Sequence, residues 1–135
     1  INLIVEESFD FISGTRYSKG GFRLGGSFFA SNLSKLANKL FCLFSNFPLT
    51  DCTTGIKMMK KEVWNSISLE SKPIGWAFAF ELSIKVYLNK FKMAEVPLKS
   101  VDRLFGGPST FKPLPWIKEY LKWFFWGLKK IRKIK

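Results

Sequence analysis

Histidine is absent from the 135-residue sequence, and cysteine and acidic residues are scarce, with two cysteines and ten aspartates and glutamates. Without histidine, neither a serine–histidine–aspartate triad nor a histidine-ligated metal can form within these residues. Cys42 and Cys52 are too far apart for a C-x-x-C motif, and so few cysteines favour a reducing, cytoplasmic setting. Cys42 is expected to pack as a small hydrophobe, whereas Cys52 follows Asp51 in a turn, where a reactive thiol is an alternative.

Several sequence motifs of nucleotide and metal sites are missing too. The aspartates are Asp10, Asp51 and Asp102, so no D-x-D pair occurs, and there is no P-loop or dinucleotide fingerprint. No stretch reaches the roughly 20 apolar residues that a membrane-spanning helix needs. The first ten residues, INLIVEESFD, lack the basic start of a signal peptide, and a beginning without methionine indicates a piece of a longer protein.

Positive charge is what the chain has in excess. Its 22 basic and 10 acidic residues give a net charge of +12, which favours nucleic acid, anionic lipid surfaces or phosphorylated small molecules as partners. Hydrophobic residues make up 47% of the chain and aromatic residues 17%, enough for one domain with a packed core.

Hydrophobic periodicity predicts strands alternating with helices, part of an α/β layered domain. Strands are expected at 9–13 and 92–103, an extended piece with a helical turn at 56–67, and helices at 27–44 and 115–135. Residues 76–88 have an apolar residue at every second position, like a strand, but their alanines, glutamate and lysine favour the helix that we predict. In the helix at 27–44 the apolar stripe is Phe29, Leu33, Leu36, Leu40 and Leu43 or Phe44, and the polar face is Ser31, Asn32, Lys35, Asn38 and Lys39.

Two arginines lie in glycine-containing loops far apart in the sequence. Arg16 follows the end of one predicted strand, and Arg103 ends another, just before Gly106 and Gly107. A guanidinium at such a place can bind a diphosphate through paired N–H donors, although an arginine of this kind on its own is more often a solvated loop residue. Parallel strands deliver their loops to a common edge, so the pair together favours phosphate binding. Both loops are expected to be exposed, so exchanging either arginine for lysine should leave folding unaffected.

Three acidic residues are candidates for chemistry, each with a structural alternative. Asp51 could orient a nucleophile or a cation, or could only form a turn. Glu81 lies on a strongly apolar segment, where a buried carboxylate is either catalytic or paired with a loop arginine. Asp102 is adjacent to Arg103 and could serve only to hold it in position.

The C-terminal helix combines aromatic residues with lysines. Trp116, Trp123, Phe124 and Trp126 alternate with lysines in a pattern typical of a helix lying in a membrane interface. The alternative is a terminal helix docked on the domain with a basic outer face. We expect the membrane interface, because these aromatic residues exceed what one buried stripe would hold.

Six short motifs follow one another along residues 9–112, each occurring once. They are the Gly14-Thr15-Arg16-Tyr17 segment with Gly20-Gly21, then SKLAN, TDCTTGIK, GWAFAFE, EVPLKSVDR and GGPSTFK. In this order they resemble the C-terminal half of family-2 glycosyltransferases, the group that includes dolichyl-phosphate mannose synthase. The resemblance implies an α/β, Rossmann-like, GT-A type nucleotide-sugar-binding domain. It would comprise residues 1–112, followed by a basic amphipathic interfacial helix at 113–135.

The resemblance also implies roles for individual residues. Arg16 and Arg103 match arginines that contact the phosphates of the sugar nucleotide, and Asp51 and Glu81 are the candidate catalytic carboxylates. Thr110 stands where the family has a lysine, and Lys112, two residues later, is its possible substitute. The nucleotide pocket and the D-x-D pair that binds Mg²⁺ or Mn²⁺ would lie in an N-terminal half outside this chain, so no metal ligand is expected here and the chain alone should not catalyse transfer.

The function implied is that of an inverting hexosyltransferase. It would transfer a sugar from a nucleotide-sugar to polyprenyl phosphate, as a peripheral protein on the inner, cytoplasmic face of a membrane with an anionic surface. Polyprenyl phosphate needs no strong base, whereas a saccharide hydroxyl, as in cell-surface glycan synthesis, would require a carboxylate such as Asp51. The other alternative is a non-enzymatic basic module that binds anionic membranes or nucleic acid. Of these, lipid fits the aromatic tail better, and no nucleic acid is expected.

Overall fold

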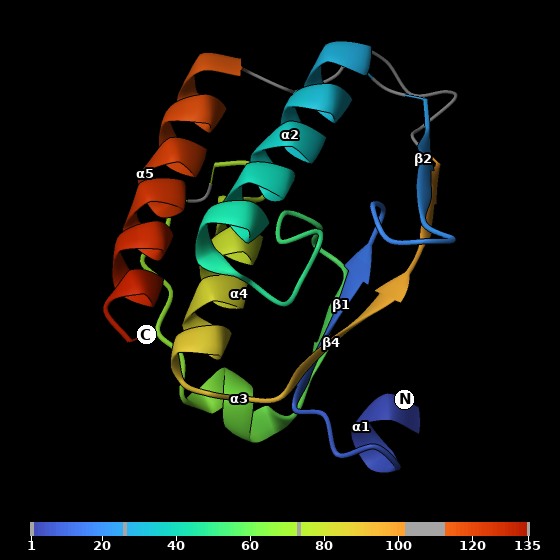
Figure 1. The fold of residues 1–135 in the computed structure, drawn as a ribbon, viewed down its shortest axis with the longest axis vertical. Helices are drawn as coiled ribbons and strands as arrows, with labels where there is room; N and C mark the ends of the chain where they lie inside the picture. Colours follow the sequence, from blue (N-terminus) through green and yellow to red (C-terminus); the bar gives the residue numbers. More distant parts are fainter. Residues whose placement is uncertain (1, 26, 73, 102–112, 135) are drawn as a thin grey trace.

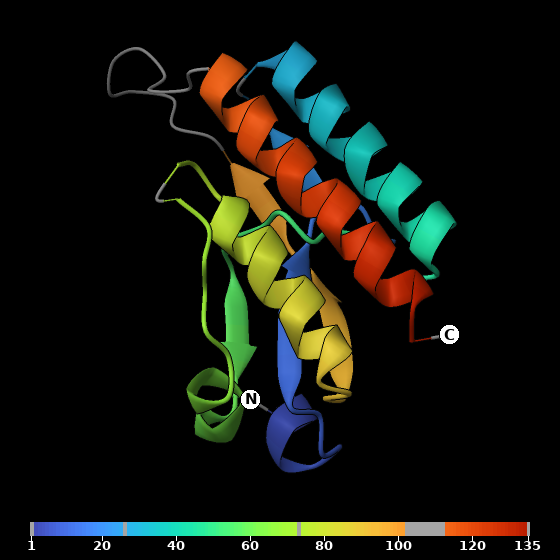
Figure 2. The same ribbon diagram turned by 90° about the vertical axis from the view of Figure 1, so that its left-hand side faces the viewer.

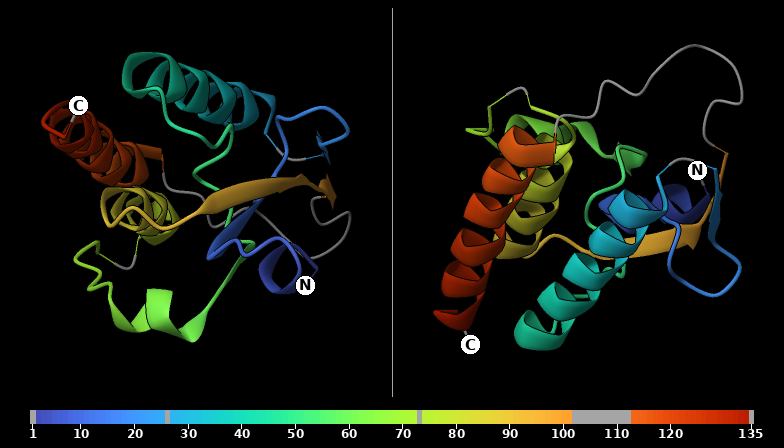
Figure 3. Two further views of the ribbon diagram at one scale, coloured as in Figure 1. Left: turned by 60° about the horizontal axis from the view of Figure 1, so that its bottom comes forward. Right: turned by 90° about the horizontal axis from the view of Figure 1, so that it is seen from above.

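Helices pack on one face of a small mixed sheet in the computed structural model, which describes residues 2–25, 27–72, 74–101 and 113–134 (Figure 1). The elements are α1 (Asn2–Val5), β1 (Phe11–Thr15), β2 (Phe22–Leu24), α2 (Phe28–Ser45), β3 (Lys57–Met59), α3 (Lys61–Asn65), α4 (Ala77–Leu88), β4 (Met93–Pro97), β5 (Lys99–Val101) and α5 (Pro113–Arg132). In Figure 2, α4 lies in front of the sheet and α5 in front of α4, beside α2. The short helix α1 lies on the other side of the sheet (Figure 3). The expected α/β fold class is confirmed, and none of the described helices is long and apolar enough to cross a membrane.

The main sheet has the strand order β3-β1-β4, with β1 parallel to β4 and antiparallel to β3. The parallel pairing places Thr15 opposite Pro97, so the carboxyl ends of β1 and β4 meet at one edge (Figure 3). Beyond that edge, β2 and β5 form a second, two-stranded parallel ribbon. The sequence predicted one strand at 92–103; the structure divides it into β4 and β5, and finds β2 inside the segment expected to be all loop.

The helix predicted at 76–88 is confirmed as α4. Its apolar residues do not form one stripe because α4 is buried nearly all round, between the sheet and α5 (Figure 2). A helix that packs on several sides needs apolar residues on several sides, so its period-two pattern carries no information about strand structure. Burial, rather than backbone propensity, therefore explains the ambiguous sequence.

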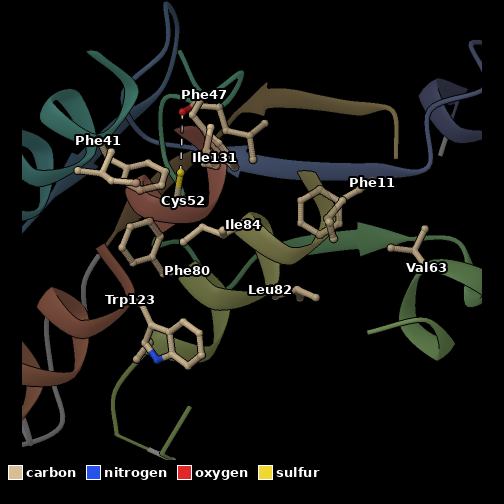
Figure 4. Close-up of a cluster of buried hydrophobic side chains, with 14 residues drawn as sticks. Phe11, Phe41, Phe47, Cys52, Val63, Phe80, Leu82, Ile84, Trp123 and Ile131 are labelled. Atoms are coloured by element: carbon tan, nitrogen blue, oxygen red, sulfur yellow. Dashed lines mark hydrogen bonds between the residues drawn. The ribbon is translucent and has the colours of Figure 1, made fainter. Parts of the chain in front are cut away.

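Phe41 joins three helices at the centre of the core (Figure 4). Its ring makes edge-on contacts with Phe80 of α4 at 4.9 Å, Phe47 after α2 at 5.3 Å and Phe124 of α5 at 5.5 Å between centroids. Such aromatic pairs contribute about 0.5–1.5 kcal/mol each beyond the burial of their area. The aromatic cluster thus fixes α5 to α2 and α4.

The apolar stripe of α2 faces away from the core, although an amphipathic pattern indicates that it should face the core. A helix begins here because the Ser27 side chain accepts a hydrogen bond from the Ala30 N–H, and it ends at Asn46 in the left-handed conformation. An apolar stripe normally faces the core, yet Phe29 is 69% exposed and Leu43 is 70% exposed. Asn38, assigned to the polar face by the sequence, is buried instead. The side of α2 that carries Asn38, Phe41 and Ser45 therefore faces the domain, whereas Asn32, Lys35 and Lys39 of the predicted polar face are exposed.

Candidate functional site

Arg16 and Asp51 form a buried ion pair immediately after β1. Arg16 Nε lies 2.7 Å from Asp51 Oδ2, and Nη2 lies 3.0 Å from Oδ1, so the guanidinium grips the carboxylate with two parallel hydrogen bonds. The side chain of Asp51 is fully buried and that of Arg16 is only 13% exposed. The expectation that Arg16 lies on an exposed loop is therefore wrong, because its charge is neutralised inside the domain.

Thr53 and Asn38 complete the surroundings of this pair. The Thr53 hydroxyl oxygen accepts hydrogen bonds from Arg16 Nη2 at 3.0 Å and from Asn38 Nδ2 at 3.1 Å. Its backbone N–H donates to Asp51 Oδ1 at 3.2 Å, which closes a turn on the aspartate side chain. Asp51 is thus both a turn former and the partner of Arg16. The polar side of α2 contributes Asn38 to the same network.

The two charges of the pair stabilise each other. Burial alone would raise the pKa of Asp51, but the hydrogen bonds and charge of Arg16 outweigh burial and hold that pKa below its ordinary value. Burial would likewise lower the pKa of Arg16, and Asp51 reverses the shift, so the pKa of Arg16 is raised. At neutral pH both groups are ionised, and Asp51 is a weak base.

A second carboxylate, Glu95 of β4, lies at the same edge of the sheet. It accepts hydrogen bonds from the Thr50 backbone N–H at 2.6 Å and the Thr50 hydroxyl at 2.9 Å. Thr50 in turn shares a hydrogen bond of 2.8 Å with Thr15 at the end of β1. These contacts fasten the segment that carries Asp51 to both parallel strands. Sequence reasoning missed Glu95, although its place on a strand beside the predicted loops was a usable signal.

Lys57 of β3 was also missed. Its ammonium donates to the Ser13 hydroxyl at 2.7 Å and lies 5.7 Å from the centroid of the Phe11 ring. Burial lowers the pKa of Lys57 to about 8. The neighbouring Cys52 is fully buried, and burial raises its pKa well above the ordinary value. Cys52 therefore packs as a small hydrophobe, and the reactive-thiol alternative does not describe it.

The strands β2 and β5, which follow Arg16 and precede Arg103 in the sequence, pair with each other. In the β2–β5 ribbon, Phe22 lies opposite Lys99 and Leu24 opposite Val101. The segment that follows Arg16 is therefore adjacent to the one that leads to Arg103. The predicted site residues Arg103, Thr110 and Lys112, together with Asp102, lie outside the described residues.

Glu81 belongs to a different cluster, on α4. Its carboxylate is fully buried and accepts hydrogen bonds from the backbone N–H groups of Glu70 and Ser71, at 2.7 and 2.8 Å. Lys85 Nζ lies 2.7 Å from Glu81 Oε1 and also pairs with Glu70. The sequence left Glu81 as either catalytic or paired with a loop arginine. Its partner is Lys85, and the contacts hold the segment before α4 in place.

The aromatic residues expected at a membrane interface mostly face the domain. Trp123 is 2% exposed and donates from Nε1 to Glu119 at 3.1 Å, so its ring lies inside the fold and not on an outer surface. Phe124 packs on Phe41, and Trp116 and Trp126 are half-buried. Trp116 lies so close to Gly75 that the glycine has no room for a Cβ. The docked helix, one of the two alternatives, is the arrangement that α5 adopts.

Among residues 2–25, 27–72, 74–101 and 113–134, no group of three or more aspartate, glutamate or cysteine side chains could hold a metal ion. We therefore assign no ligand of Mg²⁺ or Mn²⁺ to these residues. No protein-family model matches the sequence. The chemistry of this edge of the sheet must therefore be inferred from its own geometry.

Proposed function

We propose that this chain forms the phosphate-binding part of an inverting hexosyltransferase with GT-A architecture. The enzyme transfers a sugar from a nucleotide-sugar to polyprenyl phosphate. The observation that carries the proposal is the parallel ribbon of β2 and β5, which pairs a strand that follows Arg16 with a strand that precedes Arg103 in the sequence, beyond the carboxyl edge of the sheet. In α/β folds, that edge is where ligands bind.

Arg16 is the residue to which we assign contact with the diphosphate. Asp51 and Thr53 engage its Nε and Nη2 atoms, so the phosphate contact falls to Nη1. A guanidinium held in this way loses little conformational freedom when it binds an anion, and it need not reorganise as charge develops on the leaving diphosphate. We assign a contact with the same diphosphate to Arg103 as well, from its place in the sequence just after β5.

The ion pair also bears on the acceptor. A sugar hydroxyl needs a base to remove its proton, and Asp51 is a poor one because Arg16 lowers its pKa. A phosphate oxygen is already anionic. In the proposed reaction this oxygen bonds to the anomeric carbon, the bond from that carbon to the diphosphate breaks, and its electron pair leaves with the nucleoside diphosphate. The configuration at the carbon inverts. Because a polyprenyl chain lies in a bilayer, the enzyme works as a peripheral protein at the inner membrane face.

Transfer assays with the intact protein test the proposal. Radiolabelled nucleotide-sugars are supplied one at a time with polyprenyl phosphate in detergent, and labelled lipid is extracted and counted. The expected product is a glycosyl polyprenyl phosphate, formed at a rate that Arg16→Lys reduces and Arg132→Lys, the same exchange on an exposed surface, does not. Absence of transfer with every donor, or equal rates in the two variants, would overturn the proposal.

A further inference from the structure

The outward face of α2 is an unpartnered apolar surface. Phe29, Leu36 and Leu43 lie on this face and are all more than half exposed. Phe28, at the start of the helix, is exposed as well. Soluble domains seldom leave so many large apolar side chains together in water, and such patches mark interaction sites. In this helix the arrangement has a structural cause, because Asn38, on the opposite side of the helix, is held against Thr53 and Cys52.

The surface continues onto α5, which lies beside α2 in Figures 1 and 2. An apolar groove separates the two helices, lined by Phe44 of α2 and by Phe124, Phe125 and Leu128 of α5. Phe125 and Leu121 are exposed on the same helix. The contact of Phe41 with Phe124 beneath the groove holds the two helices together. The two helices therefore present one apolar surface, which we call the α2–α5 face.

The charges around the α2–α5 face are of one sign. Its cations are Lys35 and Lys39 on α2 and Lys118, Lys122, Lys129, Arg132 and Lys133 on or just after α5, all of them exposed. Helix α2 contains no acidic residue. Helix α5 contains one, Glu119, which is buried and bonded to Trp123 and to the Lys72 N–H. An apolar stripe flanked by basic side chains is complementary to acyl chains beneath anionic headgroups.

We propose that the α2–α5 face docks on an anionic lipid bilayer, with α2 inserting Phe29, Leu36 and Leu43 below the headgroups. This surface differs from the one expected from the sequence, which rested on α5 alone and included the buried Trp123. Both helices lie along the membrane plane, and the lysines remain at headgroup level. The inference does not depend on transferase activity, because only contacts and charges on the outer surface carry it.

Co-sedimentation of the full chain with vesicles tests this directly. Vesicles of phosphatidylcholine with 30% phosphatidylglycerol, on the order of an anionic cell membrane, are compared with pure phosphatidylcholine. We expect binding to the anionic vesicles and at least a tenfold loss of affinity in the double variant Phe29→Ser/Leu36→Ser. The matched control is Trp64→Ser, which removes an exposed aromatic residue from α3, away from the α2–α5 face, and should change affinity less than twofold. Unaltered far-UV circular dichroism ensures that a loss of affinity does not reflect unfolding.

A label placed on α2 provides a second readout. A nitroxide attached to Leu36→Cys should become accessible to oxygen and protected from a water-soluble nickel relaxer on vesicles, whereas one on Trp64→Cys should not. The native thiols do not interfere, because Cys52 is fully buried and burial raises the pKa of Cys42 to about 11.

Two results would overturn the inference. One is vesicle affinity in the α2 double variant equal to that of the unaltered chain. The other is a dimer, detected by sedimentation velocity without lipid, that the same double variant dissociates while the unaltered chain binds no vesicles. In that case a second copy of the chain covers the α2–α5 face.

Discussion

The side-chain oxygen of Asn38, in the middle of α2, accepts a hydrogen bond of 2.7 Å from the backbone N–H of Cys52. The amide nitrogen of the same side chain donates to Ser34 one turn earlier and to Thr53. This single residue thus couples the orientation of α2 to the segment that carries Asp51. The contact holds the Asn38 side of the helix inward, so that the apolar stripe on the opposite side faces outward.

Asn38→Leu should therefore destabilise the protein, although it adds an apolar residue to a helix. The change leaves the buried Cys52 N–H without its partner, which costs about 1–3 kcal/mol in the free energy of unfolding. Urea denaturation followed by tryptophan fluorescence measures the loss. Asn32→Leu, the same exchange at an exposed position of α2, should shift stability by no more than about 0.5 kcal/mol. Equal effects at both positions would contradict an inward-facing Asn38.

Asp51→Asn should be more damaging, because it leaves the buried Arg16 charge uncompensated. Removing one partner of a buried ion pair costs about 3–5 kcal/mol. Asp10→Asn, which affects a more exposed pair with Lys60, serves as the control and should cost about 1 kcal/mol or less. Similar losses in the two variants would mean that the Arg16–Asp51 pair is not closed in solution.

The Arg16–Asp51 pair should also make the free energy of unfolding depend on pH in the acid range. Because the pKa of Asp51 is lowered in the folded state, its contribution is present above the ordinary value of 3.8 and is lost as pH falls through the lower folded value. Stability measured in urea at several pH values should therefore fall more steeply below about pH 4 in the unaltered protein than in Asp51→Asn.

Lys57 should give a second pH dependence of stability, at alkaline pH. Its folded pKa of about 8 lies below the ordinary 10.5, so the unfolded chain binds more protons between these two values. Stability should rise with pH across that window, since the cost of burying the charged amine disappears. Lys57→Met removes the titrating group. The gap in unfolding free energy between the unaltered protein and this variant should change steadily from pH 8 to 9.5, and a constant gap would show that Lys57 is not buried.

Arg16→Lys and Arg103→Lys test the shared phosphate ligand of the proposed transferase. Each should lower kcat/KM about ten- to a hundredfold, or ~1.4–2.8 kcal/mol for one lost charge-assisted bond. A lysine provides one point charge where the arginine provides a two-pronged donor. The double variant should lose less than the sum of the single losses, because both groups hold one diphosphate. Strict additivity would mean that the two arginines do not share a ligand. Arg16→Lys should also reduce stability, since the Asp51 carboxylate loses one of the two hydrogen bonds that the Arg16 guanidinium donates to it.

The three long helices, α2, α4 and α5, were predictable from the sequence because their patterns are local. The helix at 76–88 could be recognised despite its period-two pattern, since alanines, a glutamate and a lysine favour helix. The direction in which α2 faces could not, because it depends on hydrogen bonds from Asn38 to residues more than a dozen positions away. An amphipathic pattern reports only that two sides of a helix differ.

The candidate site was predictable in part for a similar reason. Arg16 and Asp51 were recognised individually, each with a structural alternative, but their pairing spans 35 positions and left no trace in local sequence. The strand predicted at 92–103 breaks near Pro97, and this is consistent with proline having no backbone N–H to donate to a neighbouring strand. Glu95 and Lys57 were missed because their significance comes only from the strands that lie beside them.

The parallel pairing of β1 with β4 also affects the order in which the parts of the chain fold. Asp10, just before β1, bonds to the N–H of Lys92, 82 positions later in the chain. Contacts that span so much sequence form slowly, because a large loop must close before they gain any stabilisation. During synthesis the N-terminal strand therefore emerges from the ribosome long before its partner exists, while α2 can already form. We expect the edge of the sheet that carries Arg16 to be assembled after the helices, as one of the last steps of folding.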